Sequence, residues 1–101
     1  MILNPATRTR ILADLTVDID PTGSTVEIKV DGTWYPADWQ GSPVLAAGKW
    51  KQTARTTGYF AGPDAVAAGA TVLAVGRHLT KTRVTSGADI LVAGSSPIDV
   101  R

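Results

Sequence analysis

Catalysis by side chains needs a titratable group beside a nucleophile, so the single histidine, His78, is the first candidate for chemistry. Histidine is the side chain that changes charge near neutral pH, as general acid–base catalysis requires. Its charged neighbours in the sequence, Arg77 and Lys81, are cations that disfavour its protonated form. Neither Ser86 nor Ser95 stands in the nucleophile-elbow pattern of a catalytic triad. We therefore expect no enzyme, and we expect His78 to be a strand-end or surface residue.

Carboxylates are the next groups that could bind a ligand. Asp14, Asp18 and Asp20 lie close together, and the Asp-x-Asp pair places two carboxylates on one face of a strand. A calcium loop needs about six or more oxygen ligands, usually with a glycine and a distal glutamate. An alternating strand that keeps one face in water explains the same spacing. The chain has no cysteine, and its glycines match no phosphate-binding loop, so we expect no metal and no cofactor.

All the aromatic residues lie between residues 34 and 60. Clustered aromatics can stack on sugars or on nucleic-acid bases, and basic residues flank Trp50 as they do in single-strand binding proteins. In a chain this short, such residues more often fill the core or anchor an interface. We favour the second interpretation and keep a carbohydrate-stacking platform of Trp34, Trp39 and Trp50 as an alternative.

Ten basic residues against nine acidic ones leave a net charge of +1, which is no signature of a nucleic-acid or membrane protein. The charges are segregated, because residues 1–40 are mainly acidic, apart from Arg8, Arg10 and Lys29, and residues 49–83 are mainly basic. Ordinary solvated strand faces explain this pattern, and so does a bipolar surface that docks copies or partners head to tail. For the second case the candidate interface residues are Arg8, Arg10, Trp39, Lys49, Trp50, Lys51, Arg55, Arg77, Lys81 and Arg83.

A chain of 101 residues forms one small domain, 1–101, with a thin core. No apolar run reaches the roughly 20 residues of a bilayer span, and the N-terminus lacks the apolar region of a signal peptide. With no cysteine to form disulfides, synthesis in a reducing cytoplasm is favoured. We expect a soluble protein that gains stability from neighbours in an assembly.

The clearest element is a hairpin over residues 25–35, TVEIKVDGTWY. Apolar and polar residues alternate in its first half, and Asp31-Gly32 is a strong type I′ turn signal. A two-residue loop pairs Ile28 with Tyr35, which places Tyr35 on the Val/Ile face and Trp34 on the opposite face. With turn signals every eight to twelve residues or so, the chain predicts an all-β domain, a small β-sandwich or partly open β-barrel of about seven short strands.

Other segments give weaker predictions. We expect residues 1–12 to form an extended, exposed arm. We expect residues 36–48 to form a long loop or a broken segment, interrupted by prolines and glycines, with a brief strand contact at Val44-Leu45. A strand over 49–56 continues through Tyr59-Phe60, and residues 62–69 form a second flexible loop. The apolar run 71–75 predicts a strand buried on both faces.

The phrases LNPATRTRILADLTVDI, GTWYPADWQGSPV, RTTGYFAGPDA and GRHLTKTRVTSGADILVAGSSPIDV cover most of the chain. Together they resemble small virion proteins of long-tailed actinobacterial phages, specifically the head-to-tail connector proteins of the stopper, or head-completion, type. The resemblance brings no motif residue with it, so no functional site is carried over.

The resemblance implies a subunit of a homo-oligomeric ring beneath the portal–adaptor complex, which seals the DNA-filled head and docks the tail. It implies neighbouring connector and tail proteins as partners, possible non-specific contact with packaged DNA, and a place in the virion after assembly in the bacterial cytoplasm. A loop projecting into the ring lumen would be formed by Gly41, Ser42, Pro43 and Gly48, or by residues 62–69. Two alternatives stay open: a capsid decoration or tail-tube-associated protein, and a carbohydrate-binding module of a tail tip.

Overall fold

The structure is a computed structural model that describes residues 1–65, 69–94 and 96–101. Within these ranges the chain is all-β and forms no helix, as the sequence predicts. Ser95 and residues 66–68, part of the predicted loop at 62–69, lie outside the described residues. The strands are β1 Ile2–Leu3, β2 Arg8–Thr9, β3 Leu12–Val17, β4 Thr25–Val30, β5 Thr33–Ala46, β6 Lys49–Thr56, β7 Phe60–Ala61, β8 Thr71–Val72, β9 Gly76–His78, β10 Thr80–Ser86, β11 Asp89–Gly94 and β12 Ile98–Val100.

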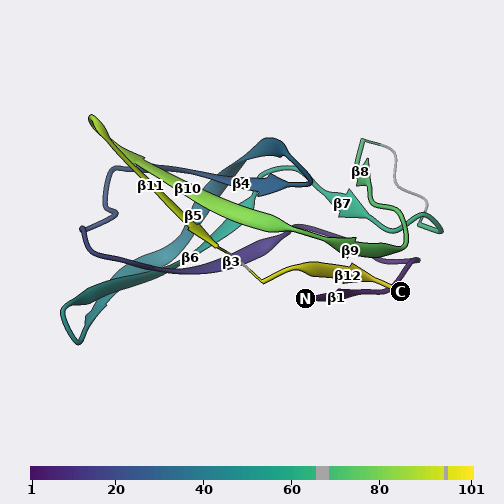
Figure 1. Ribbon diagram of the computed structural model, residues 1–101, viewed down its shortest axis with the longest axis horizontal. Helices are drawn as coiled ribbons and strands as arrows, with labels where there is room; N and C mark the ends of the chain where they lie inside the picture. Colours follow the sequence, from purple (N-terminus) through teal and green to yellow (C-terminus); the bar gives the residue numbers. More distant parts are fainter. Residues whose placement is uncertain (66–68, 95) are drawn as a thin grey trace.

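Six antiparallel strands form the main sheet, in the order β11-β10-β4-β5-β6-β3. The sheet curls into half a barrel whose two edges are β11 and β3 (Figure 1). Two three-stranded sheets, β1-β12-β9 and β2-β7-β8, lie on the side of the molecule that holds both termini. A curled sheet with unjoined edges is the partly open barrel that the sequence predicts. The two-residue strands β1 and β2 and the three-residue strand β9 escaped prediction because they leave no period-2 pattern.

The predicted hairpin is confirmed in its turn and in its register. Asp31 and Gly32 have φ values of 51° and 91°, the positive range that a type I′ turn requires at both central positions. Ile28 lies opposite Tyr35 and Lys29 opposite Trp34, so the two aromatic rings occupy opposite faces. This hairpin joins β4 to β5 at the centre of the main sheet.

The core fills the concave side of the curled sheet. Every second residue of β3, β4 and β10 is buried, and this alternation matches the pleat of each strand. Tyr35 from β5 meets Phe60 edge to face, with ring centroids 4.9 Å apart. The smaller sheet β1-β12-β9 closes one end of the core with Leu3, Ile98 and Val100, each almost completely buried.

The predicted exposed arm at residues 1–12 is wrong. The β1 strand runs parallel to β12, and β2 pairs with β7, so the N-terminal segment is built into both small sheets. Leu3 and Ile11 are 1% and 2% exposed. These isolated apolar residues show no period, and their partners lie at distant positions in the sequence, so local patterning could not assign them.

Of the two predictions for residues 36–48, the long loop is wrong, because β5 continues through Ala46. The strand contact at Val44-Leu45 is confirmed, since these residues pair with Lys51 and Trp50. A β-bulge between Gln40 and Val44 absorbs the Gly41–Pro43 stretch. Pro36 lies opposite Glu27 at a position of the antiparallel ladder where the backbone nitrogen does not bond to β4. The missing N–H of proline therefore costs no hydrogen bond to that strand. Prolines and glycines therefore mark an irregular strand here instead of its end.

Two smaller predictions also fail. The run 71–75 contributes only the short edge strand Thr71–Val72, and Val72 and Val75 are exposed while Leu73 alone is buried among the apolar residues of this run. An edge position in a three-stranded sheet leaves one side uncovered, so the expected two-faced burial does not arise. Strand β6 ends at Thr56, and Phe60 belongs to β7 in a different sheet.

Candidate functional site

His78 ends β9 and is held by two acceptors. Its Nε2 lies 2.7 Å from the carbonyl oxygen of Ala74, and its Nδ1 contacts the Asp31 carboxylate in the hairpin turn. The side chain is only 12% exposed. The Ala74 carbonyl and then Asp31 raise the pKa of His78, because both favour a ring with two N–H donors. With both nitrogens engaged, His78 fastens the β4–β5 turn to β9.

The predicted acidic group does not converge. Asp14 accepts a hydrogen bond of 2.6 Å from the Thr53 hydroxyl, and Asp18 contacts Lys49. Hydrogen bonds from the Thr22 side chain and, second, from the Thr22 backbone amide lower the pKa of Asp20. Among the described residues, no three His, Cys, Asp or Glu side chains lie close enough to hold a metal ion.

Several predicted interface cations already have carboxylate partners on the same chain. Arg77 Nε lies 3.1 Å from Asp99 Oδ1, a contact that lowers the pKa of Asp99. Arg83 reaches Glu27 with Nη2 at 2.8 Å and Nε at 3.1 Å, and Lys49 pairs with Asp18. Lys51 and Lys81 are exposed and form no ion pair within the described part of the chain.

The tryptophans do not form a common platform. Trp39 and Trp50 pack against the core, and Trp39 Nε1 donates a 3.0 Å hydrogen bond to the Ser24 carbonyl. Trp34 lies on the convex face beneath cations, with Arg83 4.2 Å and Lys29 5.5 Å from its ring centroid. Both predicted interface tryptophans, Trp39 and Trp50, therefore lie half-buried on the inner face.

Three of the predicted cations do come together. The guanidinium carbons of Arg8, in β2, and of Arg10, just after it, lie 4.3 Å and 4.8 Å from the centroid of the Tyr59 ring. Arg10 Nη2 donates to the Tyr59 hydroxyl at 3.2 Å. Arg55 from β6 and Leu12 from β3 complete the walls of a hollow of about 340 Å³. We refer to Arg8, Arg10, Arg55 and Tyr59 as the arginine–tyrosine cluster.

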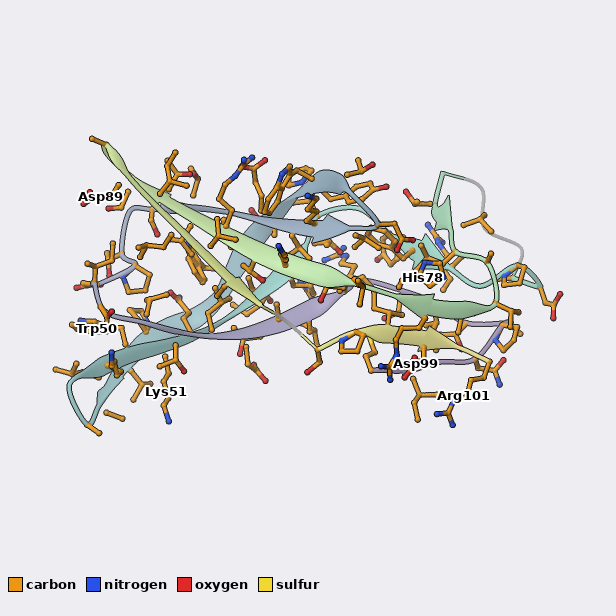
Figure 2. The ribbon with its side chains drawn as sticks, in the orientation of Figure 1. Trp50, Lys51, His78, Asp89, Asp99 and Arg101 are labelled. Carbon is orange, nitrogen blue, oxygen red and sulfur yellow. The ribbon has the colours of Figure 1, made fainter. Side chains whose placement is uncertain are left out.

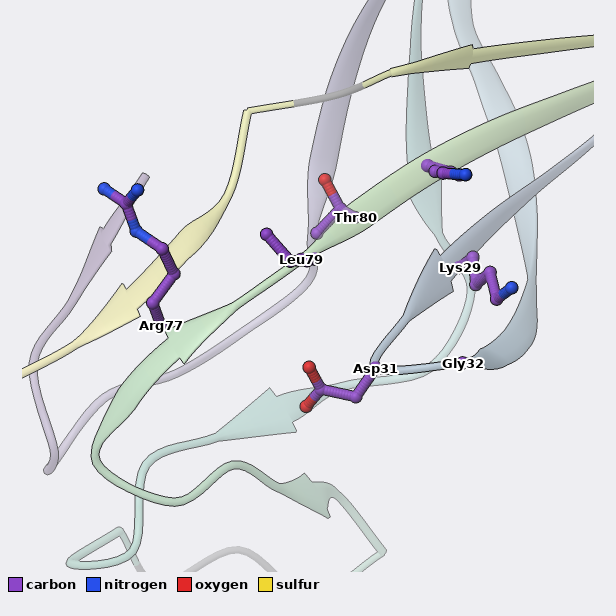
Figure 3. A pocket seen from close by; sticks show the side chains of 7 residues that line it. Lys29, Asp31, Gly32, Arg77, Leu79 and Thr80 are labelled. Atoms are coloured by element: carbon purple, nitrogen blue, oxygen red, sulfur yellow. The ribbon is translucent and has the colours of Figure 1, made fainter.

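A second hollow, of about 390 Å³, lies between the Asp31-Gly32 turn and the start of β10 (Figure 3). Leu79, 70% exposed, lies near its centre, and the cations around it come from Lys29, Arg77 and Lys81. Asp31 contributes the carboxylate that contacts His78. Figure 3 shows Arg77 and Lys29 on opposite sides of this hollow.

The residues predicted for a lumen loop occupy two separate places. Gly41, Ser42 and Pro43 form the bulge of β5, where the Gly41 carbonyl accepts a 2.8 Å hydrogen bond from Gln52. Gly48 lies with Ala47 in the tight β5–β6 turn, with φ values of 75° and 50°. This β5–β6 hairpin and the β10–β11 hairpin extend to the end of the molecule away from the termini (Figure 1). Figure 2 shows Lys51 and Asp89 toward that end, and Asp99 and Arg101 toward the other.

The two edges of the main sheet form the remaining candidate surface. On β11, Ile90 and Val92 are 62% and 57% exposed on the convex face, and on β3, Leu12 is 58% exposed on the same face. A shallow gap of about 170 Å³ separates β3 from β11. In the described ranges, neither strand has a second ladder partner, so the barrel has an open seam.

Sequence reasoning missed Tyr59, Asp31 and the β11 edge as parts of these sites. The alternation TRTR at residues 7–10 does place Arg8 and Arg10 on one face of an extended segment. Tyr59 reaches them only because β2 pairs with β7, a contact between distant parts of the chain that no local signal predicts.

The structure describes no helix that is long and apolar enough to cross a membrane. Comparison of the chain with family models, with curated proteins and with solved structures finds no match.

Proposed function

We propose that this chain is a structural protein of a phage head–tail connector, a subunit of a ring below the portal–adaptor complex that closes the DNA-filled head and docks the tail. The sequence resemblance described above suggests this role. The single structural observation that carries it is the open seam of the main sheet, with two unpaired edge strands on one subunit.

An unpaired strand presents a row of free backbone N–H and C=O groups, which readily accept a strand from another chain. On β11 this row is accompanied by the exposed side chains of Ile90 and Val92. Monomeric proteins usually blunt such an edge with charges or prolines, and within β11 the one charged residue is Asp89 at its start. The β11 edge is therefore suited to an intermolecular contact.

The other edge offers a complementary surface. Strand β3 carries Leu12 and Asp14 on its convex face, while Lys81 lies on β10 opposite Gly94, which has no side chain to shield it. A contact between β11 of one copy and β3 of the next would bring apolar side chains together and oppose unlike charges. Two different complementary surfaces on one subunit are what a closed ring requires.

The ring would place other parts of the chain against its partners. The β5–β6 hairpin, with Gly48 at its tip, is the segment best shaped to reach a lumen or a neighbouring connector or tail protein. Contact with packaged DNA would be non-specific and electrostatic, since the net charge is only +1.

The decisive experiment is a cryo-electron microscopy map of the virion in which the chain is located. We expect a ring of copies between portal and tail, in contact through β11 and β3. Virions lacking the protein should contain filled heads that leak DNA and lack tails. Density on the capsid surface or along the tail tube would instead identify the decoration or tail-tube protein, and absence from the virion would exclude all three.

The carbohydrate-binding alternative receives no support from side-chain placement. Trp39 and Trp50 pack against the core, and Arg83 covers one face of Trp34. Quenching of tryptophan fluorescence by oligosaccharides would be needed to revive it.

A further inference from the structure

The arginine–tyrosine cluster concentrates positive charge without neutralising it. Across the described residues, Arg8, Arg10 and Arg55 form no ion pair with a carboxylate. Asp38 is opposite Arg55 in the β5–β6 ladder, yet the two do not come within ion-pair distance. Three guanidinium groups of like charge in one hollow repel one another, so this arrangement favours an anion between them.

The second hollow is different. There Arg77 is paired with Asp99, Lys29 lies over Trp34, and Asp31 supplies a carboxylate. Its cations are compensated within the chain. Of the two hollows, the arginine–tyrosine cluster is therefore the one suited to an external anion.

The cluster is also ordered before any ligand arrives. The Tyr59 ring holds both guanidinium groups, with Cζ of Arg8 and of Arg10 4.3 Å and 4.8 Å from its centroid, and the hydroxyl of Tyr59 accepts from Arg10. A stacked guanidinium keeps its N–H donors free at its edges, and pre-ordering reduces the entropy lost on binding. Arg10 Nε is buried and finds no acceptor in the structure, a cost that a nearby anion would reduce.

We propose that the arginine–tyrosine cluster is a binding site for a phosphate oxyanion, either free phosphate or a phosphodiester of nucleic acid. A carboxylate has two oxygens, which a single guanidinium can satisfy, whereas a phosphate offers oxygens in several directions. The three arginines approach the hollow from different segments: Arg8 from β2, Arg10 from the residue after it, and Arg55 from β6. This arrangement suits a phosphate, whose oxygens point in several directions. The oxyanion chemistry is independent of the connector role; DNA as its source rests on the proposed function.

Two triple variants with the same net charge test the site. Replacing Arg8, Arg10 and Arg55 by glutamine removes the cluster, and replacing Lys51, Lys81 and Arg101 by glutamine removes three exposed cations elsewhere. Each triple changes the net charge from +1 to −2, that is 1 − 3. Binding of a fluorescent DNA duplex is measured by anisotropy over a range of chloride concentrations. Binding of inorganic phosphate is measured by its effect on the melting temperature at matched ionic strength.

One phosphate held by the cluster contributes a slope of about −0.9 to the logarithm of affinity against the logarithm of salt, or about 3.5-fold between roughly 50 and 200 mM. We expect the cluster triple to lose this part of the slope and the control triple to keep it. Inorganic phosphate should stabilise wild type and control but not the cluster triple. Stabilisation by phosphate without DNA binding would support the site and count against the DNA source.

Equal losses in the two triples would show that net charge alone attracts the anion and would overturn the proposal. The proposal would also be overturned if wild type bound neither phosphate nor DNA. The single variants Arg8→Gln, at an exposed residue, and Tyr59→Phe, which removes only the hydroxyl, guard against misfolding of the triple. Each should weaken binding while the circular dichroism spectrum stays native.

Discussion

His78 provides the sharpest pH dependence expected at the scale of single residues. Its folded-state pKa is raised above the ordinary value of 6.5 by the Ala74 carbonyl and Asp31. The stabilisation is therefore complete below about pH 6 and is lost as the pH rises through the raised folded-state value. As the pH rises through the folded-state pKa, we expect the melting temperature of wild type to fall relative to that of His78→Asn. The fall corresponds to a loss of about 1 kcal/mol in the free energy of unfolding.

Asp31→Asn is the matched variant, because asparagine also tolerates the positive φ of the turn. It should keep the hairpin and remove the part of the pH-dependent difference that Asp31 contributes, while the part due to the Ala74 carbonyl remains. Melting curves from about pH 5 to about pH 9 measure both effects. A difference between wild type and His78→Asn that does not vary with pH would show that His78 contributes only through packing.

Ala47 is the other residue with a specific energetic consequence. Its φ of 50° is the left-handed conformation, which costs an alanine about 1 kcal/mol relative to residues that favour it. Ala47→Asn should therefore stabilise the domain by roughly 0.5–1 kcal/mol, measured by urea denaturation. Ala88→Asn, in the β10–β11 turn but without a positive φ, should have no comparable effect.

At the scale of elements, the N-terminal segment depends on one glycine. A Cβ on Gly62 would lie 2.3 Å from the carbonyl oxygen of Pro5, and the amides of Gly62 and Asp64 donate to Thr7 and Pro5 at 3.0 and 2.9 Å. Gly62→Ala should cost about 2 kcal/mol or more, since backbone must move to relieve the clash. Gly58→Ala is the control, because nothing lies within 4 Å of its added Cβ.

Hydrogen exchange measures which element responds. We expect the amides of residues 2–11 to lose protection in Gly62→Ala before those of the main sheet, since the clash separates β7 from the turn before β2. Uniform loss of protection would mean that the N-terminal segment and the main sheet unfold as one unit.

The sequence predicts elements well where the apolar pattern is local. Strands such as β4 and β10 show clean alternation, and Asp31-Gly32 specifies its own turn, so both faces of the central hairpin were predictable. The N-terminal strands were not, because their pairing depends on partners far along the chain. The same reason explains the site: Arg8 and Arg10 were proposed for an interface because of their charge, while Tyr59 and the charge-compensating Glu27 and Asp99 required the topology.

At the scale of the whole molecule, the elongated shape separates two kinds of surface. The domain measures 42 Å by 24 Å by 23 Å, with two hairpins reaching one end and the termini on the other side (Figure 1). The open seam exposes apolar and backbone groups along β11. A thin domain gains most from a neighbour that covers such a seam, which is the physical basis for expecting self-association.

Val92→Glu tests that expectation directly. Wild type should form oligomers whose mass, measured by light scattering after size exclusion, rises with concentration. A glutamate at position 92 lies opposite Arg83 within the same subunit, so the monomer should tolerate it. In the assembly it would bring a charge to the β11 edge and face the acidic β3 edge, weakening association by about ten- to a hundredfold.

Val75→Glu, also exposed, at 66%, but away from both edges, should assemble like wild type. Equal weakening in both variants would place the contact elsewhere, and a wild type that stays monomeric at the highest concentrations would contradict edge-mediated assembly.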